Sequence, residues 1–146
     1  MFSKPFILSL LLLFTFQVSF SQINSNRKKL PATRTSTPPK IDGKIDDAAW
    51  KNVPVANNFF MMRPDNGTKE PDSHKTEVKL IYDDEAIYIS ANMYAPNPSK
   101  IPVEFTNRDN FGNADFFLVT INPNDDGQNP FEFIVSSAGS QADSKI

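Results

Sequence analysis

The chain has 146 residues, of which 39% are hydrophobic and 22% charged, and this length and composition fit a single globular domain. Its formal net charge of −2 provides no basic field, so we expect no nucleic-acid partner. The absence of cysteine excludes disulfide bonds, thiolate catalysis and cysteine-ligated zinc.

The first 21 residues have the pattern of a secretory signal peptide. Lys4 precedes an apolar run over residues 6–14, and the small residues Ser19 and Ser21 mark a cleavage site. The run is short against the roughly 20 residues of a membrane span, so we favour cleavage near Ser21 over an uncleaved anchor. The pattern predicts export to the periplasm, the outer membrane or the cell exterior.

A polar, proline-containing stretch follows over residues 22–39. It offers few side chains to bury, so we predict an extended linker that Pro38 and Pro39 stiffen. An edge strand formed by its last residues is one option. The folded domain is predicted over residues 40–146.

The predicted domain begins with a tight turn and a capped helical turn. Asp42 and Gly43 form the turn, because glycine takes a positive φ without steric cost and aspartate bonds the backbone two residues on. Asp46 or Asp47 can then cap a short helix that ends at Trp50. We predict that Trp50, the single tryptophan, closes the core of the sandwich rather than holding a sugar ring.

Several short runs beyond Trp50 predict β-strands. Residues 76–82 and 87–94 alternate between apolar and polar side chains, and the acidic turn between them makes them a hairpin. We expect its Tyr82 and Tyr88 to be structural residues. The other predicted strands cover residues 57–62, 116–121 and 131–135, and residues 101–107 are either a strand or an extended passage.

Short strands at intervals of about 8–12 residues, separated by turns, are typical of an all-β sandwich or barrel. Residues 137–146 turn as if towards a further strand and then stop. We therefore expect the sequence to be part of a longer protein, with closing strands and a C-terminal domain still to come. Any contact with a membrane is expected through that parent protein.

Few residues are candidates for catalysis. His74 is the sole histidine and lies in a polar loop, and the sequence holds no nucleophile elbow of the form Gly-x-Ser-x-Gly. The 17 aspartate and glutamate residues lie mostly in turns, so no glycosidase pair stands out. A solvated loop histidine is the favoured interpretation of His74.

A loop before the strand at residues 116–121 combines planar polar groups with an aromatic ring. Its residues of interest are Arg108, Asp109, Phe111, Asn113 and Asp115. Sugar sites have this composition, because hydroxyl groups need polar partners and the C–H face of the sugar ring needs an aromatic platform. A purely structural loop is the alternative, and Asp115 alone could ligate calcium or cap the next strand.

Residues 40–146 resemble the family 9 carbohydrate-binding modules, in the version found at the amino terminus of large exported proteins of Gram-negative bacteria. The resemblance rests on residues 41–50, 76–89, 108–109, 115–117 and 131–133, followed by Gly139 and Asp143. It implies a β-sandwich of two antiparallel sheets, immunoglobulin-like or jelly-roll-like, that binds polysaccharide ends or small sugars. It also implies structural calcium, for which Asp42, Asp47 and Asp115 are the candidate ligands.

Two functions follow from these observations. The first is an exported, non-catalytic carbohydrate-binding domain of a protein that degrades a xylan-like polysaccharide. The second is a structural or docking domain of a larger outer-membrane-associated protein. The second is favoured by the presence of one tryptophan only, since paired tryptophans clamp the sugar in the best-known members of the family. A part of a glycoside hydrolase is the weakest alternative.

Overall fold

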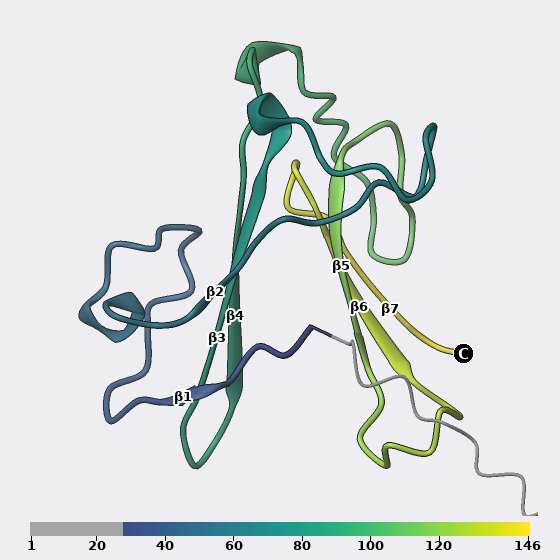
Figure 1. Cartoon of the computed structure of the whole chain (residues 1–146). Coiled ribbons are helices and arrows are strands. Elements are labelled where there is room, and N and C mark those ends of the chain that lie inside the picture. Colours follow the sequence, from purple (N-terminus) through teal and green to yellow (C-terminus); the bar gives the residue numbers. More distant parts are fainter. Residues whose placement is uncertain (1–27) are drawn as a thin grey trace, which may run out of the picture.

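The structure, a computed structural model, describes residues 28–146, so the predicted signal peptide lies outside the described residues. These residues form the predicted all-β fold, with two sheets, three short 3₁₀ turns and no α-helix in the described part. Figure 1 shows the sheets as two layers that splay apart in a sandwich-like arrangement. No helical segment within residues 28–146 has the length and apolar character needed to cross a membrane.

The first sheet is built around β3 (Thr76–Tyr82). β4 (Ile87–Met93) pairs antiparallel with its whole length, which confirms the predicted hairpin. The other edge of β3 carries the antiparallel β2 (Val55–Ala56) and the parallel β1 (Thr33–Arg34). This sheet is therefore mixed rather than purely antiparallel, because the long connection from β1 to β3 allows the two strands to run in the same direction.

The second sheet contains β5 (Phe116–Ile121), β6 (Phe131–Ser136) and β7 (Gln141–Lys145), paired antiparallel in that order. β5 and β6 confirm the two strands predicted there. The turn into β7 is made by Gly139, whose φ of 85° lies in the left-handed region that favours glycine. The residues that end the sequence thus complete a third strand.

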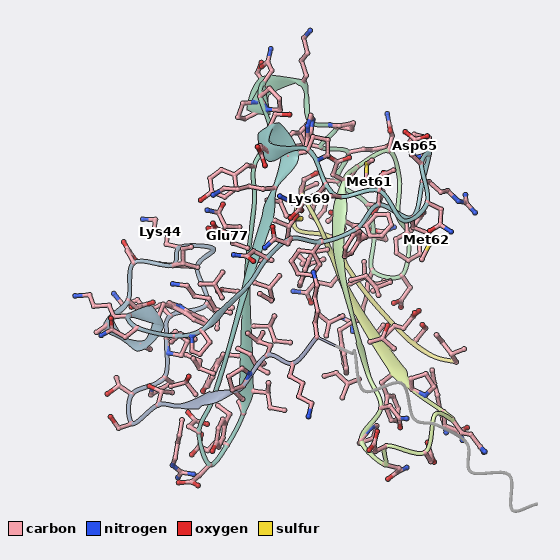
Figure 2. The ribbon with its side chains drawn as sticks, in the orientation of Figure 1. Lys44, Met61, Met62, Asp65, Lys69 and Glu77 are labelled. Atoms are coloured by element: carbon pink, nitrogen blue, oxygen red, sulfur yellow. The ribbon has the colours of Figure 1, made fainter. Side chains whose placement is uncertain are left out.

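The apolar run at residues 57–62 was predicted as a strand, and that prediction is wrong. Asn58 has a φ of 56°, which interrupts the extended backbone, and the strand β2 lies just before the run. Only Phe60 forms an isolated bridge, with Lys69. Figure 2 shows Met62 in the loop that results, where its side chain is 80% exposed.

The passage at residues 101–107 is extended rather than a regular strand. Val103 forms an isolated antiparallel bridge with Ala114, just ahead of β5. The backbone N–H of Glu104 donates to the carbonyl of Asn113 at 3.2 Å. This passage therefore runs beside the segment that leads into β5.

The hairpin of β3 and β4 has two different faces, because successive side chains point to opposite sides of a strand. Ile81 and Tyr88 are register partners and share one face, while Ile87 and Ile89 lie on the other. Ile81 is fully buried and packs with Trp50 and Val53, with Ala49 and Tyr88 at the margin. This cluster is the hydrophobic core of the first sheet.

The core position of Trp50 differs from the prediction in one respect. Trp50 is 5% exposed, so its burial is confirmed. However, it packs on the Ile81 face of the first sheet, and Figure 1 shows its segment on the side of β3 and β4 that faces away from the second sheet. Trp50 therefore closes a core outside the sandwich and does not plug the space between the sheets.

The turn at Asp42 and Gly43 has the predicted structure. Gly43 has a φ of 79°, and the Asp42 carboxylate accepts a hydrogen bond from the Lys44 N–H at 3.0 Å. Asp47 is the N-cap residue of the 3₁₀ turn Ala48–Trp50, but its side chain makes no cap bond. Its carboxylate instead accepts from the Lys40 N–H at 3.1 Å, so it ties the turn to the preceding chain.

Asp83 organises the turn between β3 and β4. One carboxylate oxygen accepts from the N–H groups of Glu85 and Ala86, both at 2.8 Å, and the other accepts from the Tyr88 hydroxyl at 2.9 Å. The backbone bonds are the main reason that the pKa of Asp83 lies below its ordinary value of 3.8. The bond to Asp83 likewise raises the pKa of Tyr88.

Replacing Ile81 by alanine should lower the free energy of unfolding by about 2–5 kcal/mol, because the change opens a cavity in the small core under Trp50. Chemical denaturation followed by tryptophan fluorescence measures this directly. Ile41→Ala is the control, because Ile41 is 84% exposed and its loss should cost about 0.5 kcal/mol or less. Equal losses for the two variants would contradict the assigned core.

Replacing Asp83 by asparagine should flatten the acid limb of the stability curve. The folded-state pKa of Asp83 is depressed, so its contribution is present above pH 3.8 and is lost as the pH falls through the folded-state value. Melting temperatures measured from about pH 6 to about pH 2 test this. Asp84→Asn, on the exposed neighbour, is the control and should leave the acid limb in place.

Candidate functional site

A cleft of about 470 Å³ lies between β4 and the second sheet. Figure 2 shows side chains from both sheets reaching into the space between the two layers. The cleft is lined by Ile87, Ile89, Arg108, Phe117, Val119, Ile121, Phe133, Ile134, Val135, Gln141, Ala142 and Asp143. Its lining is mostly apolar and comes from both sheets, so we take it as the candidate site.

The floor of the cleft follows from the alternation of β5 and β6. Phe117 pairs with Val135 and Val119 pairs with Phe133, so these four side chains share one face of the second sheet. Phe133 remains 50% exposed. The floor therefore presents an accessible aromatic ring among aliphatic neighbours.

The polar rim of the cleft comes from β7 and from Arg108. Asp143 is the register partner of Phe133, and Gln141 is the partner of Val135, so each polar side chain lies beside an apolar one. The Arg108 guanidinium donates to the Gln141 side-chain oxygen at 3.3 Å and forms an ion pair with Asp143. Because the Arg108 and Asp143 side chains are 59% and 49% exposed, this pair is accessible and contributes little to stability.

Asp109 fixes the loop to the outer edge of β7. Its φ of 64° lies in the left-handed region, which aspartate tolerates better than most residues. Its N–H donates to the Gln141 carbonyl at 3.0 Å, and its carboxylate accepts from the Asp143 N–H at 3.3 Å. Asp109 therefore occupies backbone groups that a further strand would use, and it holds Arg108 at the cleft.

Ser140 provides the second attachment of this loop. It is 7% exposed, and its hydroxyl accepts from the Thr106 N–H at 2.9 Å while donating to the Thr106 carbonyl at 3.1 Å. Both backbone groups of Thr106 are thus satisfied by one side chain. This buried hydroxyl therefore holds the start of the loop, and Asp109 holds it further along.

The other predicted ligand residues do not line the cleft. The Phe111 ring lies 6.0 Å from that of Phe116, whose position in β5 is on the face opposite Phe117. The Asn113 N–H donates to the Glu104 carboxylate at 2.7 Å. The structure therefore brings Arg108 to the cleft, with Asp109 as its support, and places Phe111 and Asn113 elsewhere.

Asp115 also lies apart from the cleft. Its carbonyl accepts from the Ser137 N–H at 2.7 Å, and it lines a separate hollow together with His74 and Pro102. His74 itself is exposed, and its Nδ1 lies 3.0 Å from the hydroxyl of the neighbouring Ser73. His74 is solvated, as the sequence predicted, but it ends the 3₁₀ turn Asp72–His74 instead of lying in an irregular loop.

The candidate calcium ligands do not form a shell. Asp42 and Asp47 each accept a backbone N–H within the turn that they stabilise. Among residues 28–146, no three acidic or histidine side chains lie close enough together to hold a metal ion, and Asp115 is no exception. The three carboxylates therefore share no acidic cluster in the described chain, and the structural calcium that the family resemblance implies stays a prediction.

The residues of the site that sequence reasoning missed are Phe133, Gln141 and Asp143. Phe133 was recognised as part of a strand, and Asp143 as a landmark of the resemblance. The spacing of Gln141 and Asp143 by two is the signal that places both on one face of a strand. Three comparisons, with protein family models, with curated proteins and with solved structures, found no match to this chain.

Replacing Ser140 by alanine should loosen the loop that carries Arg108. The change leaves the N–H and carbonyl of Thr106 without their partner, and we expect a loss of about 1–3 kcal/mol. Hydrogen exchange at residues 106–110 should accelerate as well. Ser144→Ala is the matched control, because that exposed hydroxyl bonds only the Glu132 side chain and should affect neither quantity.

Proposed function

We propose that this chain is an exported, non-catalytic carbohydrate-binding domain that takes a sugar in the cleft between its sheets. The observation that carries the proposal is the half-exposed Phe133 ring beside Asp143, with Arg108 bonded to that carboxylate. An aromatic ring next to planar polar groups is the combination that a sugar needs. The signal peptide pattern supports export, and the family resemblance supports a xylan-like polysaccharide or a small sugar as the ligand.

The chemistry of the two partners is complementary. The C–H face of a pyranose ring packs on an aromatic ring, while its hydroxyl groups accept hydrogen bonds from a guanidinium and donate hydrogen bonds to a carboxylate. In this cleft Phe133 would carry the ring, while Asp143, Gln141 and Arg108 would bond its hydroxyl groups. The cleft volume of about 470 Å³ lies within the range of small-molecule sites.

The lining of the cleft favours binding over catalysis. Glycoside hydrolysis needs two carboxyl groups on either side of the scissile bond, about 5–10 Å apart. Asp143 is the one acidic residue among those that line the cleft in the described chain, and it is paired with Arg108. The second carboxyl group that hydrolysis needs has no counterpart among these lining residues.

A structural or docking domain is the second candidate, and one observation favours it. Apolar side chains that point between the sheets stay open to solvent, with Ile87 61% and Val135 43% exposed. Exposed apolar surface of this kind marks an interaction site. In that function the cleft would receive protein from the parent molecule instead of a sugar.

Isothermal titration with xylo-oligosaccharides and other soluble sugars, together with pull-down on xylan and cellulose, tests the first candidate. We expect retention on at least one glycan. Phe133→Ala should weaken it about tenfold, because the aromatic platform is lost while the rim is kept. Asp143→Asn should weaken it as well, since the ion pair with Arg108 is removed.

Phe116→Ala is the matched control for the binding experiment. Phe116 is 53% exposed, close to the exposure of Phe133, but it lies on the opposite face of the same sheet. Its replacement should leave binding unchanged. A chain that is folded by circular dichroism and retained on no glycan would contradict carbohydrate binding and favour the docking domain.

A further inference from the structure

The aromatic floor of the cleft continues beyond Phe133. Phe131 lies two residues earlier on β6, so its side chain is on the same face of the second sheet. Its register partner on β5 is Ile121, which lines the cleft. Phe131 is 41% exposed, so a second accessible ring lies on the face that forms the floor.

β7 places a charged side chain beside each of the two rings. Asp143 is the register partner of Phe133, and Lys145 is the register partner of Phe131. The Lys145 Nζ lies 5.8 Å from the centroid of the Phe131 ring. A phenyl ring on β6 with a charged partner on β7 thus occurs twice in succession along the two strands.

The two positions are separated by two residues on each strand. Residues two apart in an antiparallel strand lie about 6.8 Å from each other along its axis. A single pyranose ring stacks on one phenyl ring, so a sugar on Phe133 leaves Phe131 uncovered. The next ring of a linear glycan, joined through one glycosidic oxygen, reaches the second position. The repeat of the two side-chain pairs therefore matches a chain of sugars better than an isolated sugar.

We propose that the cleft floor holds two consecutive rings of a linear glycan, the first over Phe133 and the second over Phe131. This inference rests on the proposed carbohydrate binding, and it specifies the ligand as a disaccharide or a longer chain that lies along β6 and β7. Asp143 and Arg108 would bond the first ring. Lys145 would bond the second.

The two positions offer different hydrogen bonds. At the first, the Asp143 carboxylate accepts and the Arg108 guanidinium donates, so sugar hydroxyl groups find both kinds of partner. At the second, the Lys145 ammonium only donates. Its attraction to the Phe131 ring is weak because both residues are exposed, so the ammonium turns towards a sugar hydroxyl at little cost. The first ring should therefore supply most of the affinity, and the second should add to it.

Isothermal titration of the full chain with a monosaccharide and the matching disaccharide tests the two positions. Two such pairs serve as probes, xylose with xylobiose and glucose with cellobiose. In at least one pair the disaccharide should bind about tenfold more tightly than the monosaccharide, because its second ring gains an aromatic platform. A site for one ring would give nearly equal affinities.

Variants of the two rings assign the gain to its position. Phe131→Ala should bring the ratio of the two affinities close to one, since it removes only the second platform. Lys145→Met should lower the ratio less, and Phe133→Ala should weaken the monosaccharide itself. Phe116→Ala, the control on the opposite face of the sheet, should leave the ratio unchanged. Circular dichroism checks the fold of each variant, and the ratio in Lys145→Met decides if Phe131→Ala is unfolded.

The outcomes separate this inference from the proposed function. Nearly equal affinities within both sugar pairs, or a ratio that survives Phe131→Ala, would overturn the second position while carbohydrate binding stands. An equal loss of both sugars in Phe131→Ala keeps the ratio, so it would overturn the second position as well. Retention on a glycan without binding of any of the four sugars would also overturn this inference alone. A folded chain that binds none of the four sugars and is retained on no glycan would overturn both.

Discussion

The backbone of β3 is the constraint on which the first sheet depends. Every other strand of that sheet pairs with it, so its N–H and carbonyl groups are engaged along both edges. Its side chains point alternately to the two faces of the sheet. Ile81 anchors the small core beneath Trp50, while the alternate residues share the face of Ile87 and Ile89, two residues that line the cleft. Two surfaces of different purpose thus arise from one strand, because the side-chain period of a strand is two.

Much of this fold could be predicted from the sequence. The hairpin of β3 and β4 was predictable because apolar and polar side chains alternate over seven residues on each strand, and Asp83 marks the turn between them. The prediction of a strand at residues 57–62 was wrong, because the apolar composition of this run does not reveal the left-handed backbone at Asn58. Burial of Trp50 was predictable from its type, but the face on which it packs depends on pairing between distant segments.

The site could be predicted from the sequence less completely than the fold. Arg108 was identified as a ligand candidate, but its importance comes from Gln141 and Asp143, some thirty residues later in the chain. β7 is polar at most positions, and only its pairing with β6 makes it a strand that places those side chains beside Phe133. Local composition identified a polar loop, whereas register between strands determined which of its residues reach the cleft.

The left-handed Asp109 has a consequence for how the second sheet can pair with further strands. A sheet grows by adding strands at its edges, and a carboxylate that already accepts the N–H of Asp143 leaves the β7 edge a poor template. Growth of the second sheet in that direction ends with a side chain rather than with a strand. The β7 edge is thereby protected against pairing with a further strand, and a single loop residue provides that protection.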